Sequence, residues 1–531
     1  MQSSITDGMQ KVLSIGGLMD TKVTQIQFEE GLFELSEESL RELQGSKYLN
    51  DDLRPTTAGE RTWTTYNVGM LWVGMVICIT GFSFAAALIA LGFSPMVALL
   101  NVLIGNLIVL IPMQLNSHAG TRYGIPFPVF SRITFGKIGA QVPSLVRAVV
   151  ACGWCSIQCW VGGAAVSAII GLFISSWDQE GTGRFIGFGI FLLISLALAW
   201  KGSESIKWLE AIGSPVLLIT CVALVVWVVT TGHANGITVG EMFFSSGDSE
   251  MVATNGDAAF LFLASITSNI AVWATLALNI PDFSRYARSQ KDQFWGQMLF
   301  MPISVIFMAA IGAMYAHVTL VVDGVAQYDP TAVLGQLNNS GIIVISSLCT
   351  MIATLTTNIA ANTVAPANGF SNLAPSKISF RGGLLITAAL CILYRPWWIY
   401  GSAGAFMFTF LGNCGTVLGP VAAILVADYF FVKKKRVDIY ALYEEGNDKY
   451  SYSNGWNWKA ILSWLVACLI TMPGTFGIGG TFFAWINANS YILGFLIAMC
   501  LYIVLMKNET KSQVSEEEFE AMTRNEFSSK K

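Results

Sequence analysis

The feature that most limits the fold of this chain is the separation of its charged residues by long apolar runs. Only 12% of the 531 residues are charged and 54% are apolar, whereas a soluble domain carries roughly a quarter charged residues. An apolar run of about 20 residues is long enough to cross the hydrocarbon core of a bilayer as a helix. The sequence therefore predicts an all-α polytopic membrane protein surrounded by lipid.

Hydropathy predicts twelve membrane-spanning helices, of which the ninth is interrupted by Arg395-Pro396. Polar tails are expected at 1–62 and 507–531. The expected spans are 65–92, 95–116, 142–172, 184–201, 206–230, 258–281, 295–321, 340–365, 383–398, 402–431, 457–473 and 484–506.

The distribution of Lys and Arg predicts the orientation, because cytoplasmic loops carry an excess of both. With the N-terminus inside, the opposite side carries only Arg184 and Arg395. We therefore expect a multi-pass protein of the cell's inner (plasma) membrane with both termini in the cytoplasm. The basic run 433–436 directly follows an apolar helix, so we interpret it as a topology anchor and not as a nucleic-acid-binding patch. The expected cytoplasmic loops carry Arg122, Arg132, Lys137, Lys201, Lys207, Arg285, Arg288, Lys291, Lys377, Arg381, the 433–436 run and Lys449.

The first five spans (63–232) and the next five (258–432) can be laid over each other, which predicts an internal repeat. Pro215 and Pro420 each follow a small residue in the fifth and tenth spans, at an offset of 420 − 215 = 205. Trp72 and Trp273 have an offset of 273 − 72 = 201. Because five is an odd number, the second copy must be inverted, as in many secondary transporters. The last two spans (457–506) follow the repeat.

Two spans carry small polar residues in their middles: the first has Thr80-Gly81-Phe82-Ser83, and the sixth has Ser265, Thr267, Ser268 and Asn269. A helix that unwinds there exposes backbone carbonyls, which is tolerated only where they line a cavity or hold an ion. Alternatively, these residues help the helices to associate. The residues alone do not decide between broken helices and ordinary packing.

The middles of the first, third, sixth and eighth spans contain neutral polar and aromatic side chains and no charged ones. Trp154 and Gln158 are four residues apart, and so are Asn358 and Asn362, so each pair shares one helix face. Amides donate and accept hydrogen bonds, and the indole of Trp273 offers a stacking surface. Together they suit a planar neutral ring with alternating N–H and C=O groups. Alternatively, the amides only join helices.

Three further groups have possible roles. The hydroxyls of Thr356 and Thr357, beside a broken first span, would offer oxygen ligands to a sodium ion. Arg147 and Asp282 lie at the cytoplasmic ends of the third and sixth spans, and we predict that they pair and hold the inner side closed; alternatively, they are solvated separately. Cys152, Cys155 and Cys159 have helical spacing, but no His accompanies them, so we interpret them as packing residues rather than a metal site.

Several motifs resemble the nucleobase–cation symporter family, which includes hydantoin, allantoin, uracil and cytosine permeases. The similarity extends from about Asn50 to Lys507. The matching stretches are Arg61-Thr62-Trp63, Asn116 to Phe127 (NSHAGTRYGIPF), Ala151 to Gly162 (ACGWCSIQCWVG), Trp273 to Arg285 (WATLALNIPDFSR), Thr356 to Asn362 (TTNIAAN) and Leu418 to Phe430 (LGPVAAILVADYF).

The resemblance implies a leucine-transporter-type inverted repeat of five plus five helices, with broken helices 1 and 6 and two more helices at the end. The family's substrate-stacking tryptophans match Trp154 and Trp273, and its ring-binding amides match Gln158 and Asn362. Asn358 is a further candidate on the same helix face. A first-span position that is polar in relatives is Cys78 here, so the exact substrate does not transfer.

The resemblance also implies an ion site and a gate. The sodium site of the hydantoin-transporting branch matches the backbones of Gly74, Ile77 and Ala353 and the hydroxyls of Thr356 and Thr357. The inner gate matches Arg147 and Asp282. Relatives couple to sodium or to protons, so the coupling ion is Na+ or H+.

We expect a secondary active transporter that imports a neutral nucleobase-like heterocycle of the allantoin, uracil, hydantoin or cytosine class by cation symport with alternating access. No enzyme activity and no cofactor are expected, and the transport unit is expected to be a monomer. The alternatives are a symporter of another neutral or zwitterionic solute on the same fold, a channel, or a non-transporting membrane sensor.

Overall fold

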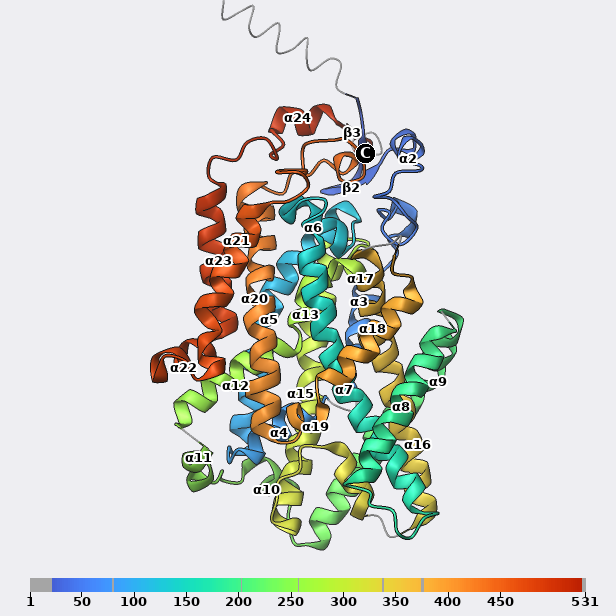
Figure 1. The fold of residues 1–531 in the computed structure, drawn as a ribbon, viewed down its shortest axis with the longest axis vertical. Helices are drawn as coiled ribbons and strands as arrows, with labels where there is room; N and C mark the ends of the chain where they lie inside the picture. Colours follow the sequence, from blue (N-terminus) through green and yellow to red (C-terminus); the bar gives the residue numbers. More distant parts are fainter. Residues whose placement is uncertain are drawn as a thin grey trace, which may run out of the picture.

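The computed structural model describes residues 22–78, 81–201, 203–255, 257–336, 339–373 and 377–527. Within these ranges, seven helices are long and apolar enough to cross a membrane, and a bent pair adds an eighth crossing if it counts as one. The long helices lie side by side along the long axis of the molecule (Figure 1). They are α5 (Pro95–Tyr123), α7 (Gln141–Gly171), α8 (Thr182–Trp200), α9 (Ser203–Ala234), α15 (Gln290–Asp323), α16 (Ser340–Thr357) and the continuous unit η4–α20–η5 (Ala405–Leu411, Gly412–Val426, Ala427–Val432).

In the described ranges, three apolar helices have 10–17 residues: α12 (Ala258–Val272), α18 (Phe380–Leu393) and α21 (Trp458–Thr471). The ninth expected span therefore ends early, since α18 stops at Leu393 and Arg395 has a left-handed φ of 53° before the short α19 (Pro396–Ile399). The last expected span is not one straight helix, because α22 (Gly480–Ala488) and α23 (Ser490–Met506) meet at 84°.

The first expected span is divided into α3 (Thr65–Val76) and α4 (Ser83–Ala90). The backbone turns tightly between them: the Cys78 amide donates to the Val76 carbonyl at 2.8 Å, and the Gly81 amide donates to the Cys78 carbonyl at 2.8 Å. A Cβ on Gly81 would lie 2.8 Å from the Val76 oxygen, so a side chain there would clash with the turn. Thr80, which was expected at this break, lies outside the described residues.

The sixth expected span is interrupted at Trp273, between α12 and α13 (Ala274–Asn279), and not at the polar residues 265–269. The Ser265 hydroxyl donates to the Leu261 carbonyl at 2.6 Å, and the Asn269 amide donates to Asn101 Oδ1 on α5 at 2.9 Å. These side chains bond to their own helix or to a neighbour, so they support helix association rather than unwinding.

Two further helices contain π-helical stretches. Helix α16 continues through η3 (Asn358–Val364) into α17 (Ala365–Leu373), and η4 and η5 flank α20. The prolines used to align the repeat lie inside helices that continue through them, Pro215 in α9 and Pro420 in α20. The remaining short helices are α2 (Glu37–Glu42), η1 (Ala58–Glu60), α6 (Phe127–Phe135), α10 (Val239–Phe244), α11 (Ser249–Asn255), α14 (Pro281–Ser284), η2 (Pro330–Gln336), η6 (Tyr440–Leu442), η7 (Pro473–Phe476) and α24 (Glu516–Ala521).

The two tails meet at one end of the molecule in a small sheet, which the all-α expectation did not include. Strand β1 (Gln25–Glu29) pairs antiparallel with β2 (Leu32–Leu35) and parallel with β3 (Thr523–Asn525). Figure 1 shows these strands with α2 and α24 at the end opposite α10 and α11. Phe33 stacks on Tyr123 at the end of α5 with 5.5 Å between ring centroids, so the sheet is attached to the helices.

A buried ion pair lies at the same end of the molecule. Asp428 in η5 and Lys433 directly after it are both fully buried, with 3.7 Å between carboxylate oxygen and ammonium nitrogen. Asp428 also accepts hydrogen bonds from Tyr502 at 2.8 Å and from Thr134 at 3.0 Å. The basic run 433–436 is therefore not uniformly solvated, because its first residue is part of the interior.

We predict that Asp428→Asn lowers the free energy of unfolding by about 3–5 kcal/mol, because it leaves the buried ammonium without a counter-charge. Thermal unfolding of the purified protein in detergent measures this loss. The double variant Asp428→Asn/Lys433→Met should recover much of it, and the exposed neighbour Lys434→Met should have little effect. Equal stability of wild type and Asp428→Asn would contradict the role of the pair.

Candidate functional site

Helix α7 is the element around which the expected site residues are arranged. It packs against α13, α16, η3 and α18, so side chains from the third, sixth, eighth and ninth expected spans meet its surface. Trp154 and Gln158 lie in its middle and are both buried. Because α7 contacts both α13 and η3, the segments that carry the other expected substrate residues adjoin this helix.

The indole of Trp154 sits among aromatic rings of η4. Its centroid lies 5.3 Å from that of Phe410 and 6.3 Å from that of Phe406, both in edge-to-face geometry. Phe406 in turn stacks on Phe84 of α4 with 6.2 Å between centroids. These contacts fix the plane of Trp154 and connect it to the helix that begins after the break in the first span.

Trp273 lies at the interruption between α12 and α13 and is 7% exposed. Its ring meets that of Trp72, near the end of α3, edge to face at 5.6 Å. Its Nε1 is buried and has no hydrogen-bond partner among the residues that the structure describes. Trp154 and Trp273 do not contact each other, since each belongs to a separate aromatic group.

The two expected asparagines lie in the π-helical segment η3. Asn358 is fully buried, and its Nδ2 donates to the Cys159 sulfur of α7 at 3.5 Å. Its Oδ1 has no hydrogen-bond partner in the described part of the chain. Asn362 is 9% exposed in the same segment. A π-helical turn inside an α-helix is frequently associated with a functional site, so both amides occupy a segment suited to binding.

The five residues expected to hold sodium come from two helices. Gly74 lies in the last turn of α3 and Ile77 directly follows the helix, where the last carbonyls have no amide four residues ahead. Ala353 and Thr356 lie in α16, and the Thr356 hydroxyl donates to the Ala353 carbonyl at 2.8 Å. Thr357 follows at the last position of α16 and is partly exposed. Cys78 lies in the turn after Ile77 and is buried.

Arg147 and Asp282 do not form a direct ion pair in this structure, and the Asp282 carboxylate is held by other partners. One Asp282 oxygen accepts the Phe127 backbone amide at 2.8 Å, and the other accepts Asn279 Nδ2 at 3.2 Å. Phe127 is the first residue of α6, where an anion is favoured by the helix dipole. Asp282 therefore joins the end of the sixth span to the short helix that precedes α7.

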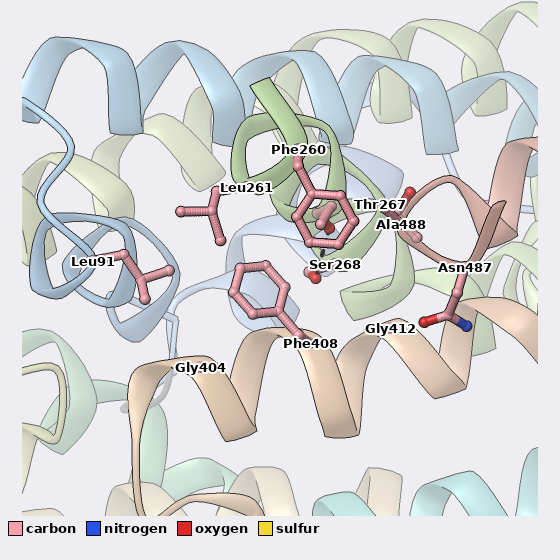
Figure 2. A pocket seen from close by; sticks show the side chains of 11 residues that line it. Leu91, Phe260, Leu261, Thr267, Ser268, Gly404, Phe408, Gly412, Asn487 and Ala488 are labelled. Carbon is pink, nitrogen blue, oxygen red and sulfur yellow. Dashed lines mark hydrogen bonds between the residues drawn. The ribbon is translucent and has the colours of Figure 1, made fainter. Parts of the chain in front are cut away.

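Two cavities lie away from these residues. One of about 230 Å³ is lined by α12, η4 and α22, and Figure 2 shows Phe260, Leu261 and Phe408 converging on it. The other, of about 440 Å³, adjoins the segment 246–251 and includes His317. Neither is lined by Trp154, Gln158, Trp273 or the η3 asparagines. Buried polar groups, and not cavity size, identify the candidate site.

Sequence reasoning missed the residues that hold the two tryptophans in place. Phe406 and Phe410 contact Trp154 but are ordinary apolar residues of the tenth span. From the sequence, Trp72 serves only to align the two halves of the expected repeat. Trp72 and Trp273 occupy equivalent positions in the two halves of the expected inverted repeat. This equivalence was the one sequence signal that could have placed the two rings together.

Comparisons of the sequence with known proteins find a family and named relatives. A family model described as permease for cytosine/purines, uracil, thiamine and allantoin matches residues 55–497. The purine-uracil permease NCS1 of Arabidopsis thaliana is 33% identical over 529 residues, covering 97% of this chain and 86% of the relative. The allantoin permease of Bacillus subtilis is 33% identical over 473 residues, covering 87% and 94%.

A solved structure has a similar fold. Mhp1, a nucleobase-cation-symport-1 family transporter in a closed conformation with bromovinylhydantoin bound, superimposes with a TM-score of 0.69 at 24% identity, covering 90% of this chain and 99% of Mhp1. The family model, the named relatives and the arrangement of the helices together define a multi-pass, helical membrane transporter and not an enzyme. The chain belongs to the nucleobase–cation symporter family of permeases.

We predict that Asp282→Ala lowers the free energy of unfolding by about 1–3 kcal/mol, because it leaves the Phe127 amide unpaired. Asp282→Asn retains an acceptor oxygen toward that amide and should lose clearly less. Thermal unfolding in detergent measures both variants. Equal losses of stability in the two variants would show that the charge of Asp282, and not its hydrogen bond to the Phe127 amide, stabilises the folded protein.

Proposed function

We propose that this permease imports a neutral nucleobase-like heterocycle of the allantoin, uracil, hydantoin or cytosine class by cation symport. The observation that carries the proposal is that two of the expected substrate residues each keep a buried polar atom without a partner among the described residues, the Trp273 Nε1 donor and the Asn358 Oδ1 acceptor. Leaving such atoms unpaired costs about 1–3 kcal/mol each. A ring with adjacent C=O and N–H groups would satisfy one of each kind.

The ring would lie between Trp154 and Trp273, with Gln158 and Asn362 reading its edge and Cys78 lining the cavity. The absence of charged residues from the middles of α3, α7 and α13 supports a neutral ligand, because a charged one would require a buried counter-charge. Relatives named as purine-uracil and allantoin permeases point to the same chemical class.

In the proposed architecture, α3 and α4 together form one broken span, and α12 and α13 form its counterpart in the inverted repeat. The seven long helices, the bent pair and the three shorter helices give eleven crossings, and α3–α4 is the twelfth. The contact between the equivalent residues Trp72 and Trp273 supports the inversion, since matching positions meet across a twofold axis. Both tails lie at one end, as an even number of crossings requires, and we place that end in the cytoplasm of the inner membrane.

Sodium is the proposed coupling ion, held by the carbonyls of Gly74, Ile77 and Ala353 and the hydroxyls of Thr356 and Thr357. Oxygen ligands suit a hard cation, and none of these groups titrates near neutral pH, which argues against a proton at this position.

Because one chain contains both repeats, we propose the monomer as the transport unit. Rocking of the helices of the first, second, sixth and seventh spans against those of the third, fourth, eighth and ninth would alternate access.

The first expected outcome is saturable uptake of radiolabelled allantoin, uracil, cytosine or a hydantoin by cells that express the chain. Trp154→Ala should abolish uptake by removing the stacking surface. Trp160→Ala, which removes another buried tryptophan of α7 that packs on Phe185 and Trp397 instead, is the matched control for general destabilisation. Absence of uptake of all four compounds by correctly inserted protein would exclude this substrate class, and competition by amino acids would favour a zwitterionic solute.

The same assay identifies the ion when sodium is replaced by choline and when a protonophore is added. Under sodium coupling, uptake is lost in choline and persists with the protonophore. Thr356→Val should raise the sodium concentration needed for half-maximal uptake, because it removes a proposed oxygen ligand. Ser347→Ala, which removes a buried hydroxyl elsewhere on α16, should leave that concentration unchanged. The reverse ion dependence would assign the coupling to protons.

Arg147 and Asp282 are the proposed inner gate, which closes when their charges come into direct contact. The double variant Arg147→Gln/Asp282→Asn keeps an acceptor for the Phe127 amide but removes both charges. We expect it to change the maximal uptake rate more than the half-saturating substrate concentration, because the gate acts on the conformational step. Wild-type kinetics in this variant would exclude the gate.

A further inference from the structure

Three buried cysteines from two helices meet behind the candidate substrate site. Cys155 and Cys159 lie one turn apart on α7, and Cys391 lies near the end of α18. Their sulfur atoms all lie within 4.8 Å of one another, and all three residues are buried. Cys152, the third cysteine of the α7 motif, packs separately against Ala148 and Phe370. The cluster therefore contains two cysteines of the α7 motif and a third from α18, which lies far away in the sequence.

The surroundings of these thiols are polar enough to fix them in place. The Ser156 hydroxyl donates to the Cys391 carbonyl at 2.7 Å, which fastens α18 to α7. The Cys155 sulfur lies 3.7 Å from the Thr363 hydroxyl, and the Cys159 sulfur accepts Asn358 Nδ2 at 3.5 Å. Both partners belong to η3, so the thiols contact the segment that carries the expected substrate amides.

We propose that Cys155, Cys159 and Cys391 form a binding site for a soft monovalent cation, copper(I), that nothing in the transport mechanism requires. Three sulfur ligands around an ion at about 2.3 Å would lie about 4.0 Å apart, so the sulfurs need to move by less than an ångström. Soft thiolate ligands select copper(I). Zinc takes four ligands, and the described residues bring only three Cys, His, Asp or Glu ligands together here.

Copper(I) binding displaces thiol protons, because the thiolate and not the thiol is the metal ligand. Each of the three sulfurs releases its proton to solvent as it binds, so the complex of one copper(I) with three thiolates carries a net charge of −2. A buried charge needs hydrogen-bond donors around it, and the Thr363 hydroxyl at Cys155 and the Asn358 Nδ2 at Cys159 are such donors.

Copper(I) binding to purified protein tests the site directly and independently of transport. The background carries Cys349→Ser and Cys500→Ser, because these two cysteines are at least partly exposed. Under reducing conditions, competition with a chromophoric copper(I) chelator should show one tightly held equivalent. Cys391→Ser should weaken it by at least about 100-fold, since losing even a supporting group of a metal site costs 10–100-fold. Cys414→Ser, another buried cysteine, is the matched control.

Equal copper retention in Cys391→Ser and the background, or an equal loss in Cys414→Ser, would overturn the site. X-ray absorption of the loaded protein gives a readout that does not depend on a variant folding. Three sulfur neighbours at about 2.3 Å are expected, and a shell dominated by nitrogen or oxygen would overturn the assignment. A disulfide between Cys391 and an α7 cysteine in place of copper, detected by mass spectrometry under the same reducing conditions, would also overturn it.

A consequence for transport follows from the Cys159–Asn358 contact and rests on the proposed function. Copper draws the Cys159 sulfur toward the other two, and Asn358, which donates to it, should follow. One equivalent of copper(I) should therefore reduce uptake in the background protein and leave uptake by Cys391→Ser unchanged. Equal uptake with and without bound copper would exclude this coupling while the binding data still decide the site.

Discussion

A bilayer contains no water that could satisfy exposed backbone amides and carbonyls, so an interrupted helix must be shielded from lipid or line a polar site. This chain interrupts its helices between α3 and α4, at Trp273 and along η3. The interruptions at Trp273 and along η3 adjoin α7. The position of α7 in the interior, with nearly all of its middle buried, is what allows irregular backbone to exist at these points.

The same constraint selects the side chains around α7. Buried charges would each need a partner, whereas amides, hydroxyls, thiols and indoles can be buried at lower cost. The site therefore combines neutral donors and acceptors with aromatic surfaces: Trp154 against Phe410, Trp273 against Trp72, and Asn358 against Cys159. A candidate site built in this way offers a ligand aromatic surfaces and uncharged hydrogen-bonding groups.

Charged residues are used where the helices end. Asp428 and Lys433 form a buried pair with Tyr502 and Thr134 around it, and the two tails close over this end as a three-stranded sheet. Arg61 donates to the Thr121 and Phe33 carbonyls, so the sheet is bonded to α5 and not simply adjacent to it. The end that carries both tails is thus held together by a buried ion pair, strand pairing and side-chain hydrogen bonds.

The sequence by itself determined the membrane class, the positions of most long helices, the lack of charged residues in the middles of the first, third, sixth and eighth spans, and the family, because apolar run length, charge placement and contiguous motifs are local properties of a chain. It did not locate the interruption of the sixth span, since Ser265 and Asn269 could bond to helices or unwind one, and only their partners decide. Contacts such as Cys391 with Cys155, Phe410 with Trp154 and β1 with β3 join residues far apart in the chain. Helical periodicity describes which face a residue occupies but not which helix lies opposite, so these contacts were decided by tertiary packing alone.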